Sequence, residues 1–567
     1  MNSEINIRHL AFFIVACLLV FLPGLCVDVM NVDAAQYASI SSDMLKSSNW
    51  LEIHNKGMDY LDKPPLLFWL SASCFKLFGI SNWAYKLPSF LFAILGVFST
   101  AKLGEILYDK KTGMLAALLL VFSLGMFIMT NDIRTDTLLL GSTVFAAWQL
   151  LLYLKTNQWV NLILGFIGIG LAMLAKGPLG LVLPVVALSS EFAYKREWKS
   201  FFKWQWLVGL IIIAILLLPM SYGLYQQFDL HPENEINGHT HVSGLRFYFW
   251  TQSFGRITGE SDWGTKFDNG AGPFFFTHTY LWVFFPWSLL LIGALIKNFF
   301  VLIKSRFKPG YLVEVFSTGG FVLMFIALSA SRYKLPHYVY VLLPFSALIV
   351  ARFILQDVLD PARKGLFRIF SVFHWVFFGA IFLVCTLFLF VFFPNASILT
   401  ICAAYCLLFL GILFAWKFKN PFTRLIYPLL FGLLALYFVG DSHFYPQLLK
   451  YQNGNVVGRM VIEKKIPSQD FYALNVSDHA LDFYCGHMVP TLSQSDTLIM
   501  DKAIRENGKL WLYTDEEGAA QIHSSKYHII SENKFEDYHV QFLTINFLLP
   551  EKRNGSLRYK YLMEIAI

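Results

Sequence analysis

The chain has 567 residues, of which 56% are hydrophobic and 17% aromatic, while only 15% are charged. Soluble domains carry about a quarter charged residues, so this composition excludes an ordinary soluble protein and indicates a polytopic membrane protein. The formal net charge of +7 lies mainly in short loops between apolar runs, so membrane lipids are expected partners and nucleic acid is not. The seven cysteines show no CxxC pair and no His/Cys metal spacing, so no disulfide framework is expected.

Apolar runs long enough to cross a membrane recur almost to residue 440. A crossing helix needs about 20 mostly apolar residues. About thirteen runs qualify, near residues 9–27, 84–104, 113–130, 136–154, 158–175, 178–194, 204–225, 276–296, 311–330, 337–354, 368–393, 397–416 and 424–440. The first run has a short basic lead and no small-residue cleavage site, so we expect a retained helix.

The distribution of Lys and Arg predicts the orientation of these spans. Positive residues in short loops stay on the cytoplasmic side. With the N-terminus in the cytoplasm, the inner segments hold nineteen such residues, whereas the short outer turns hold only Arg134, Lys176, Arg332 and Lys334. An odd number of spans then places everything after about residue 441 on the outer side.

Two domains are predicted. Residues 1–440 form the transmembrane domain, with long outer segments at 28–83 and 226–275. Within the first of these, a helical stretch at 34–45 and an apolar piece at 66–78, too short to span, indicate helices at the membrane interface. Residues 441–567 have ordinary polarity and alternating stretches such as 509–513, which predicts a small soluble α/β domain.

Charged and polar residues collect at the outer ends of the predicted helices, although they lie far apart in the sequence. They are Asp33, Asp62, Lys63, Arg134, Asp136, Lys176, Arg332, Lys334 and His337. Any one of them can simply extend to the interface, but carboxylates interleaved with cations favour a shared cavity. The cations suit a phosphate or pyrophosphate, and the carboxylates suit a hydroxyl acceptor that must be oriented or deprotonated. A membrane-embedded phosphate ester whose head group reacts at the water boundary fits this set.

Six motifs in the same order resemble the GT-C membrane glycosyltransferases, in the branch of the bacterial lipid A aminoarabinose transferases and the protein O-mannosyltransferases. The motifs are Asp33-Ala-Ala-Gln-Tyr37, Asp62-Lys-Pro-Pro-Leu66, Arg134-Thr-Asp136, Lys176-Gly-Pro178, Pro286-Trp287 and Lys334-Leu-Pro-His-Tyr338. The resemblance covers about residues 10–355. It implies inverting sugar transfer from a polyprenyl phosphate donor at the periplasmic face of a bacterial inner membrane. The C-terminal domain would then be periplasmic.

The resemblance also implies roles for single residues. Asp33 takes the place of the catalytic acid of the first loop, and Asp136 that of the acid at the outer end of the fourth span. Donor-phosphate binding falls to Lys63, Arg134, Lys176, Arg256, Arg332 and Lys334. Substrate positioning falls to Tyr37, Asp62, His337 and Tyr338.

The chain departs from the family pattern in the first loop, where the usual Glu and Arg are replaced by Ala34 and Gln36. The sequence is therefore compatible with three acceptors: lipid A, another envelope lipid and a protein Ser/Thr hydroxyl. A divalent metal also stays open, with Asp62 as its candidate ligand. The three histidines at 231, 239 and 241 fit a solvated loop better than a zinc site.

Two other classes of protein fit the sequence less well. A transporter or flippase predicts broken helices and charges near the middle of the membrane, whereas the spans here stay apolar. A scaffold that displays the C-terminal domain needs no carboxylates at the outer face. We therefore predict a lipid-linked-sugar glycosyltransferase with lipid A or another envelope lipid as acceptor, then transfer to protein, and a flippase after that.

Overall fold

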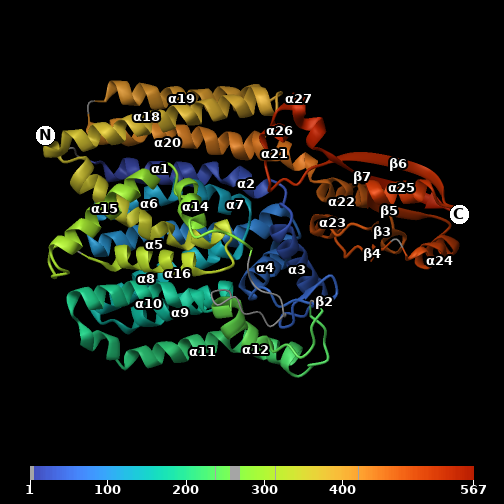
Figure 1. Cartoon of the computed structure of the whole chain (residues 1–567), viewed down its shortest axis with the longest axis horizontal. Helices are drawn as coiled ribbons and strands as arrows, with labels where there is room; N and C mark the ends of the chain where they lie inside the picture. The colour runs from blue at the N-terminus through green and yellow to red at the C-terminus, as the bar shows by residue number, and fades with distance from the viewer. Residues whose placement is uncertain (1–4, 237, 256–268, 313, 419, 494) are drawn as a thin grey trace.

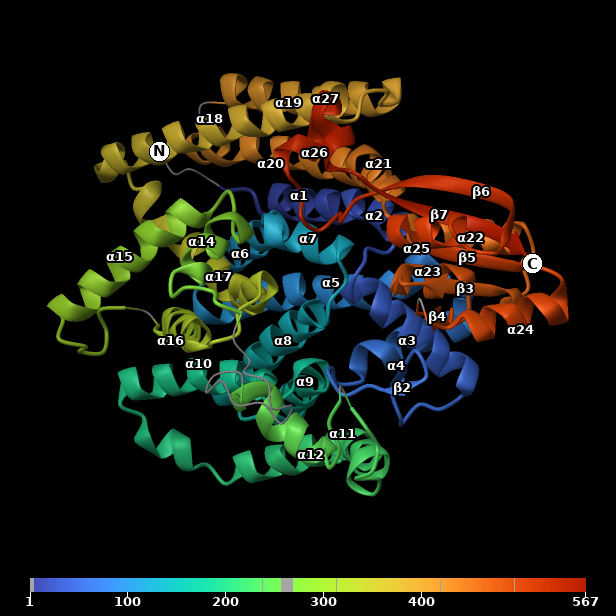
Figure 2. The ribbon, with the colours of Figure 1, turned by 45° about the vertical axis from the view of Figure 1, so that its right-hand side comes forward.

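The computed structural model describes residues 5–236, 238–255, 269–312, 314–418, 420–493 and 495–567. It shows a bundle of long helices with a smaller domain that contains a sheet at one end (Figure 1). We call this end of the bundle the domain end. Helices α9–α11 lie on one side of the bundle and α18–α20 on the other, in both views (Figures 1 and 2).

Each expected membrane span coincides with a helix or a bent pair of helices. These are α1 Ile7–Val20, α2 Leu22–Cys26, α5 Asn82–Leu107, α6 Lys110–Val121, α7 Leu124–Asn131, α8 Thr135–Thr156, α9 Trp159–Lys176, α10 Leu179–Lys195, α11 Gln205–Leu224, α14 Phe275–Val283, α15 Ser288–Lys304, α16 Phe316–Ala330, α17 Leu343–Phe353, α18 Lys364–Leu387, α19 Ile398–Lys417 and α20 Pro421–Val439. The expectation of a polytopic helical bundle is thereby confirmed.

The number of membrane crossings is less sharply defined than the number of apolar runs. Among the described residues, nine helical segments are long and apolar enough to cross a membrane unaided. Two bent pairs, α6 with α7 at 53° and α14 with α15 at 120°, raise the number to eleven. Helices α10 and α16 also coincide with expected spans but have only 17 and 15 residues. The count of thirteen stays a prediction.

The first long segment, residues 28–83, contains the two expected helices, α3 Asp33–Ser47 and α4 Leu66–Phe78. Between them lies a short antiparallel hairpin, β1 His54–Asn55 with β2 Met58–Asp59. Helix α4 begins directly after Pro64-Pro65, because proline disfavours helix in the residue before it and is well placed at a helix start. Figure 1 shows α3 and α4 between the bundle and the C-terminal domain.

The C-terminal domain is α/β, as expected from its sequence. Its sheet has the order β4-β3-β5-β7-β6, in which β3 runs parallel to β4 and β5, and β7 antiparallel to β5 and β6. The strands are β3 Phe471–Leu474, β4 Thr491–Leu492, β5 Leu510–Asp515, β6 His528–Asp537 and β7 Arg558–Ala566. The helices are α22 Asn453–Glu463, α23 His479–Cys485, α24 Thr497–Asn507, α25 Glu516–His523, α26 Ile545–Leu548 and α27 Pro550–Arg553.

Helices cover both faces of this sheet, because successive strand residues point to opposite sides. Trp511 and Tyr513 pack with residues of α22 and α23, whereas Leu510 and Leu512 pack with α24 and α25. The last helical run of the bundle continues from Pro421 to Tyr451, and the sheet domain follows with α22. The division expected at residue 440 stays a prediction.

Candidate active site

Arg134 joins two carboxylates at the domain end of the bundle. It directly precedes α8, and its guanidinium forms ion pairs with Asp33 at the start of α3 and with Asp132, Nε to Oδ2 2.9 Å. The Arg134 side chain is 14% exposed, and that of Asp33 is 38% exposed. The structure thus brings together two predicted residues that lie 101 positions apart in the sequence. The Asp33 carboxylate stays open to solvent on one side.

A second ion pair lies two residues further along α8. The Lys176 ammonium at the end of α9 pairs with Asp136 in the first turn of α8. A carboxylate at a helix N-terminus and a lysine at a helix C-terminus are each favoured by the helix dipole. Lys176 Nζ also lies 4.3 Å from the ring centroid of Tyr338, and His337 Nε2 lies 3.9 Å from Asp136 Oδ2. Four predicted site residues therefore form one cluster.

A sharp turn fixes the position of Lys176. Gly177 ends α9 with φ of +76°, which an L side chain rarely adopts, and Pro178 leads into α10. The Lys-Gly-Pro motif therefore has a structural reason as well as a chemical one.

Tyr37 and Asp62 lie near the first ion pair. The Tyr37 side chain is buried, and its ring packs against Phe68 with centroids 5.8 Å apart. Burial raises the pKa of the Tyr37 phenol well above its ordinary value, and the nearby Tyr60, Asp33 and Asp62 raise it further, against an opposing effect of Arg134. The Tyr37 hydroxyl thus stays neutral and within electrostatic range of both carboxylates.

Lys63 and Lys176 line the same cavity, which has a volume of about 140 Å³ and mostly apolar walls. The other lining residues are Pro178, Leu179, Val182, Gln252, Phe254, Met324, Ala327, Leu328, Ser331 and Tyr338. Two cations at the edge of an apolar space are suited to a ligand with an anionic head and a hydrocarbon tail.

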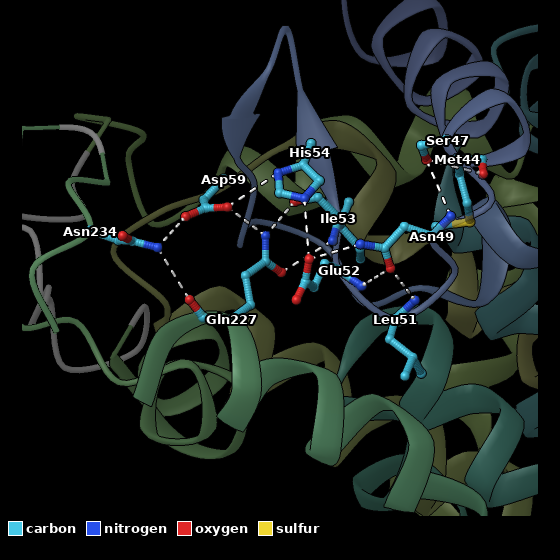
Figure 3. Close-up of polar contacts among 10 residues, drawn as sticks. All are labelled: Met44, Ser47, Asn49, Leu51, Glu52, Ile53, His54, Asp59, Gln227 and Asn234. Carbon is cyan, nitrogen blue, oxygen red and sulfur yellow. Dashed lines mark hydrogen bonds and ion pairs between the residues drawn. The ribbon is translucent and has the colours of Figure 1, made fainter. Parts of the chain in front are cut away.

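The hairpin that precedes Asp62 and Lys63 is fixed to the second long segment through Asp59 (Figure 3). Asp59 accepts hydrogen bonds from Gln227 Nε2 at 2.8 Å and Asn234 Nδ2 at 2.9 Å, and it lies 3.2 Å from His54 Nδ1. The hydrogen bond between His54 and Asp59 raises the pKa of the imidazole and lowers that of the carboxyl. Gln252 donates to the Asp62 carbonyl oxygen. Contacts from the second long segment thereby help to position Lys63.

The remaining predicted residues are less closely joined to this site. Lys334 is buried, and its Nζ donates to the Ala271 carbonyl oxygen at 3.1 Å. The side chains of Arg332 and Asp62 are exposed. Arg256 lies outside the described residues.

The described residues do not form a metal site, since no three His, Cys, Asp or Glu side chains among them are grouped to hold an ion. Asp62 as a metal ligand stays a prediction.

A larger cavity, about 860 Å³, lies between the first long segment and the C-terminal domain. Asn31 and Val32, which directly precede Asp33, form part of its wall, and Asp478, His479 and Lys560 are among the lining residues from the domain. No local pattern in the sequence pointed to these residues of the domain. Asp132 was also missed, although its position two residues before Arg134 was a visible signal.

The fold and the site together define an integral membrane protein with a helical bundle, a charged site at the domain end and an α/β domain beside that site. Residues 62–222 match the family model described as dolichyl-phosphate-mannose-protein mannosyltransferase. This matched stretch contains Lys63, Arg134, Asp136 and Lys176.

Two curated relatives are named undecaprenyl phosphate-alpha-4-amino-4-deoxy-L-arabinose arabinosyl transferase. The protein from Edwardsiella ictaluri is 26% identical over 340 residues, 58% of this chain and 56% of that protein. The protein numbered 1 from Pseudomonas fluorescens is 26% identical over 406 residues, 66% of this chain and 65% of that protein. The matches thus span less than two thirds of these relatives' length.

The crystal structure of ArnT from Cupriavidus metallidurans bound to undecaprenyl phosphate superposes with a TM-score of 0.72 at 16% identity. The superposition covers 99% of this chain and 98% of that one. The chain therefore has the fold of that protein over nearly its whole length. The expected resemblance to GT-C glycosyltransferases, and to the aminoarabinose transferases among them, is confirmed.

Proposed function

We propose that the protein is a glycosyltransferase of the bacterial inner membrane that moves a sugar from a polyprenyl phosphate donor to an acceptor of the cell envelope. One observation carries this proposal. Lys63 and Lys176 line one apolar cavity, and Lys176 pairs with Asp136, which lies two residues after the Arg134 that pairs with Asp33. A transporter or a scaffold has no need of this combination at one end of its helices.

The donor phosphate binds between Lys63 and Lys176, and the first part of the prenyl chain lies against the apolar wall. Charge-assisted hydrogen bonds to phosphate are short and strong, and each buried CH₂ group adds about 0.8 kcal/mol. The cavity of about 140 Å³ takes only the beginning of such a chain. The rest extends along the lipid-facing surface of the helices.

The reaction is a single displacement at the anomeric carbon. An acceptor oxygen forms the new bond as the bond to the donor phosphate oxygen breaks, and polyprenyl phosphate leaves with the electron pair. The Asp33 carboxylate takes the proton of an acceptor hydroxyl, and Arg134 orients that carboxylate. One displacement inverts the configuration, so no second carboxylate is needed as a nucleophile. With a phosphate acceptor there is no proton to remove, and Asp33 then positions the substrates.

The names of the relatives support an aminoarabinose donor and an envelope lipid such as lipid A as acceptor. Transfer to a protein Ser/Thr hydroxyl is the second candidate, because residues 62–222 match a model named for protein mannosylation. The cavity of about 860 Å³ beside Asn31 and Val32 offers the acceptor a route toward Asp33.

Mass spectrometry of envelope lipids and glycoproteins tests this proposal. The strains are a gene deletion and the deletion restored with wild type, with Asp33→Asn, or with Glu506→Gln as a matched control at an exposed carboxylate of α24. A glycan mass is expected to disappear in the deletion and the Asp33 strain and to return in the other two. An intact glycan in the Asp33→Asn strain refutes the role of Asp33. A trapped polyprenyl-linked sugar with unchanged glycans indicates a flippase instead.

A further inference from the structure

Gln452 binds the backbone that leads into Asp33. This residue lies at the junction between the last helical run of the bundle and α22, and it is 3% exposed. Its Oε1 accepts a hydrogen bond from the Asn31 backbone N–H at 2.7 Å, and its Nε2 donates to the Val29 carbonyl oxygen at 2.8 Å. One buried amide side chain thus satisfies two backbone groups of a single short segment.

The C-terminal domain makes three further hydrogen bonds to the same segment. Asn31 Nδ2 donates to Asp478 Oδ1 at 2.7 Å, and Asn31 Oδ1 accepts from the Ala480 N–H at 3.1 Å. The Val29 N–H donates to the Tyr484 hydroxyl at 2.9 Å. Residues 29–31 are therefore held by groups that follow them by more than 400 positions.

We infer that the C-terminal domain positions the catalytic carboxylate, with Gln452 and Asn31 as the positioning residues. The inference rests on the proposed role of Asp33. Helix α3 begins at Asp33, two residues after Asn31, and no side chain of the described structure caps its first turn. Only Val32 separates Asn31 from Asp33 in the chain, so a shift of Asn31 moves Asp33 as well. A displacement of about 1 Å at a reacting group costs on the order of 100-fold in rate.

A different contact between the same two parts of the chain provides the matched control. Lys56 Nζ lies 3.0 Å from Asp482 Oδ2 and 3.0 Å from Ser477 Oγ, so it also joins the first long segment to the C-terminal domain. Lys56 lies between the hairpin strands, 23 positions after Asp33. Loss of domain attachment alone predicts the same effect for Lys56→Ala as for Gln452→Ala. If the domain instead positions Asp33, Gln452→Ala slows acceptor modification and Lys56→Ala does not.

The test uses the full-length protein in lipid nanodiscs and in the restored deletion strain. Gln452→Ala and Asn31→Asp are expected to slow acceptor modification about 10- to 100-fold, whereas Lys56→Ala stays within about twofold of wild type. Hydrogen exchange in residues 29–37 is expected to speed up in the first two variants only. Binding of undecaprenyl phosphate, used as the probe, is expected to stay unchanged in all three.

A reciprocal exchange separates positioning from general damage. Asn31→Asp places two carboxylates together, and adding Asp478→Asn restores a donor and an acceptor with the roles reversed. The double variant is expected to recover most of the lost rate. Unchanged modification rates in Gln452→Ala and Asn31→Asp, with Asp33→Asn inactive, overturn the inference and leave the proposed function intact. Full activity of Asp33→Asn instead removes the role of Asp33 on which the inference rests, and an unchanged glycan profile in the deletion strain overturns the proposed function.

Discussion

Replacement of Lys63 by Gln tests whether the apolar cavity binds the donor phosphate. Lys63 is half-buried and lines the cavity together with Lys176, which forms the ion pair with Asp136. Lys63 is therefore the lysine of this cavity that can be replaced without removing the partner of Asp136. A hydrogen bond to a charged group contributes about 1.5–3 kcal/mol. At 1.4 kcal/mol per decade, Lys63→Gln should weaken binding of undecaprenyl phosphate about 10- to 100-fold.

The assay is titration of undecaprenyl phosphate into the protein in nanodiscs made of zwitterionic lipid. Lys203→Gln is the control, because this lysine lies just before the start of α11, whereas Met220 and Leu224, near the other end of α11, line a pocket with Lys63. Lys63→Gln leaves the Asp136 ion pair in place, and a thermal melt beside the titration shows whether the variant is folded. Binding within twofold of wild type would refute the assignment of the phosphate to this cavity.

Three further predictions concern stability. Lys176→Met should lower the free energy of unfolding by about 3–5 kcal/mol, because it leaves the buried Asp136 carboxylate without its lysine partner. The added change Asp136→Leu should recover most of this loss, and thermal melts of both variants check it. The pKa of His54 is raised, so its ion pair with Asp59 stabilises the hairpin fully below about pH 6.5. This stabilisation is lost as the pH rises through the raised pKa. Hydrogen exchange of residues 53–60 should therefore speed up over that pH range, and His54→Gln should abolish this pH dependence. Gly177→Ala should lower the free energy of unfolding by about 1–3 kcal/mol because alanine is strained at this φ, and an unchanged melting temperature would contradict that account.

The sequence predicted the parts of the site that follow from local pattern. Arg134 and Asp136 lie at the start of a long apolar helix, so their position at a helix end could be read directly. The Lys176-Gly177-Pro178 turn was equally visible, because glycine and proline mark helix ends. The helical bundle, the helices near 34–45 and 66–78 and the α/β domain also follow from hydrophobic periodicity and composition.

The partners of these residues depend on long-range packing, which no local pattern encodes. Asp59 binds Gln227 and Asn234 from 168 and 175 positions away, and its own surroundings in the sequence are those of an ordinary turn. Gln452 has the same property, since a single glutamine at a helix end carries no signal for the backbone it binds. Residues that position the site, rather than act in it, were therefore the ones missed.

The three carboxylates in the ion pairs of Arg134 and Lys176 differ in their access to water, and this difference favours one of them as the proton acceptor. The Asp136 side chain is 2% exposed and paired with Lys176, and that of Asp132 is 17% exposed. Asp33 is 38% exposed, although it shares Arg134 with Asp132. An acceptor that arrives from the aqueous side meets Asp33 first, whereas a proton transferred to Asp136 would leave Lys176 without its buried counter-ion. Asp33 therefore suits the general base, and Asp136 suits the fixing of Lys176 beside the donor phosphate.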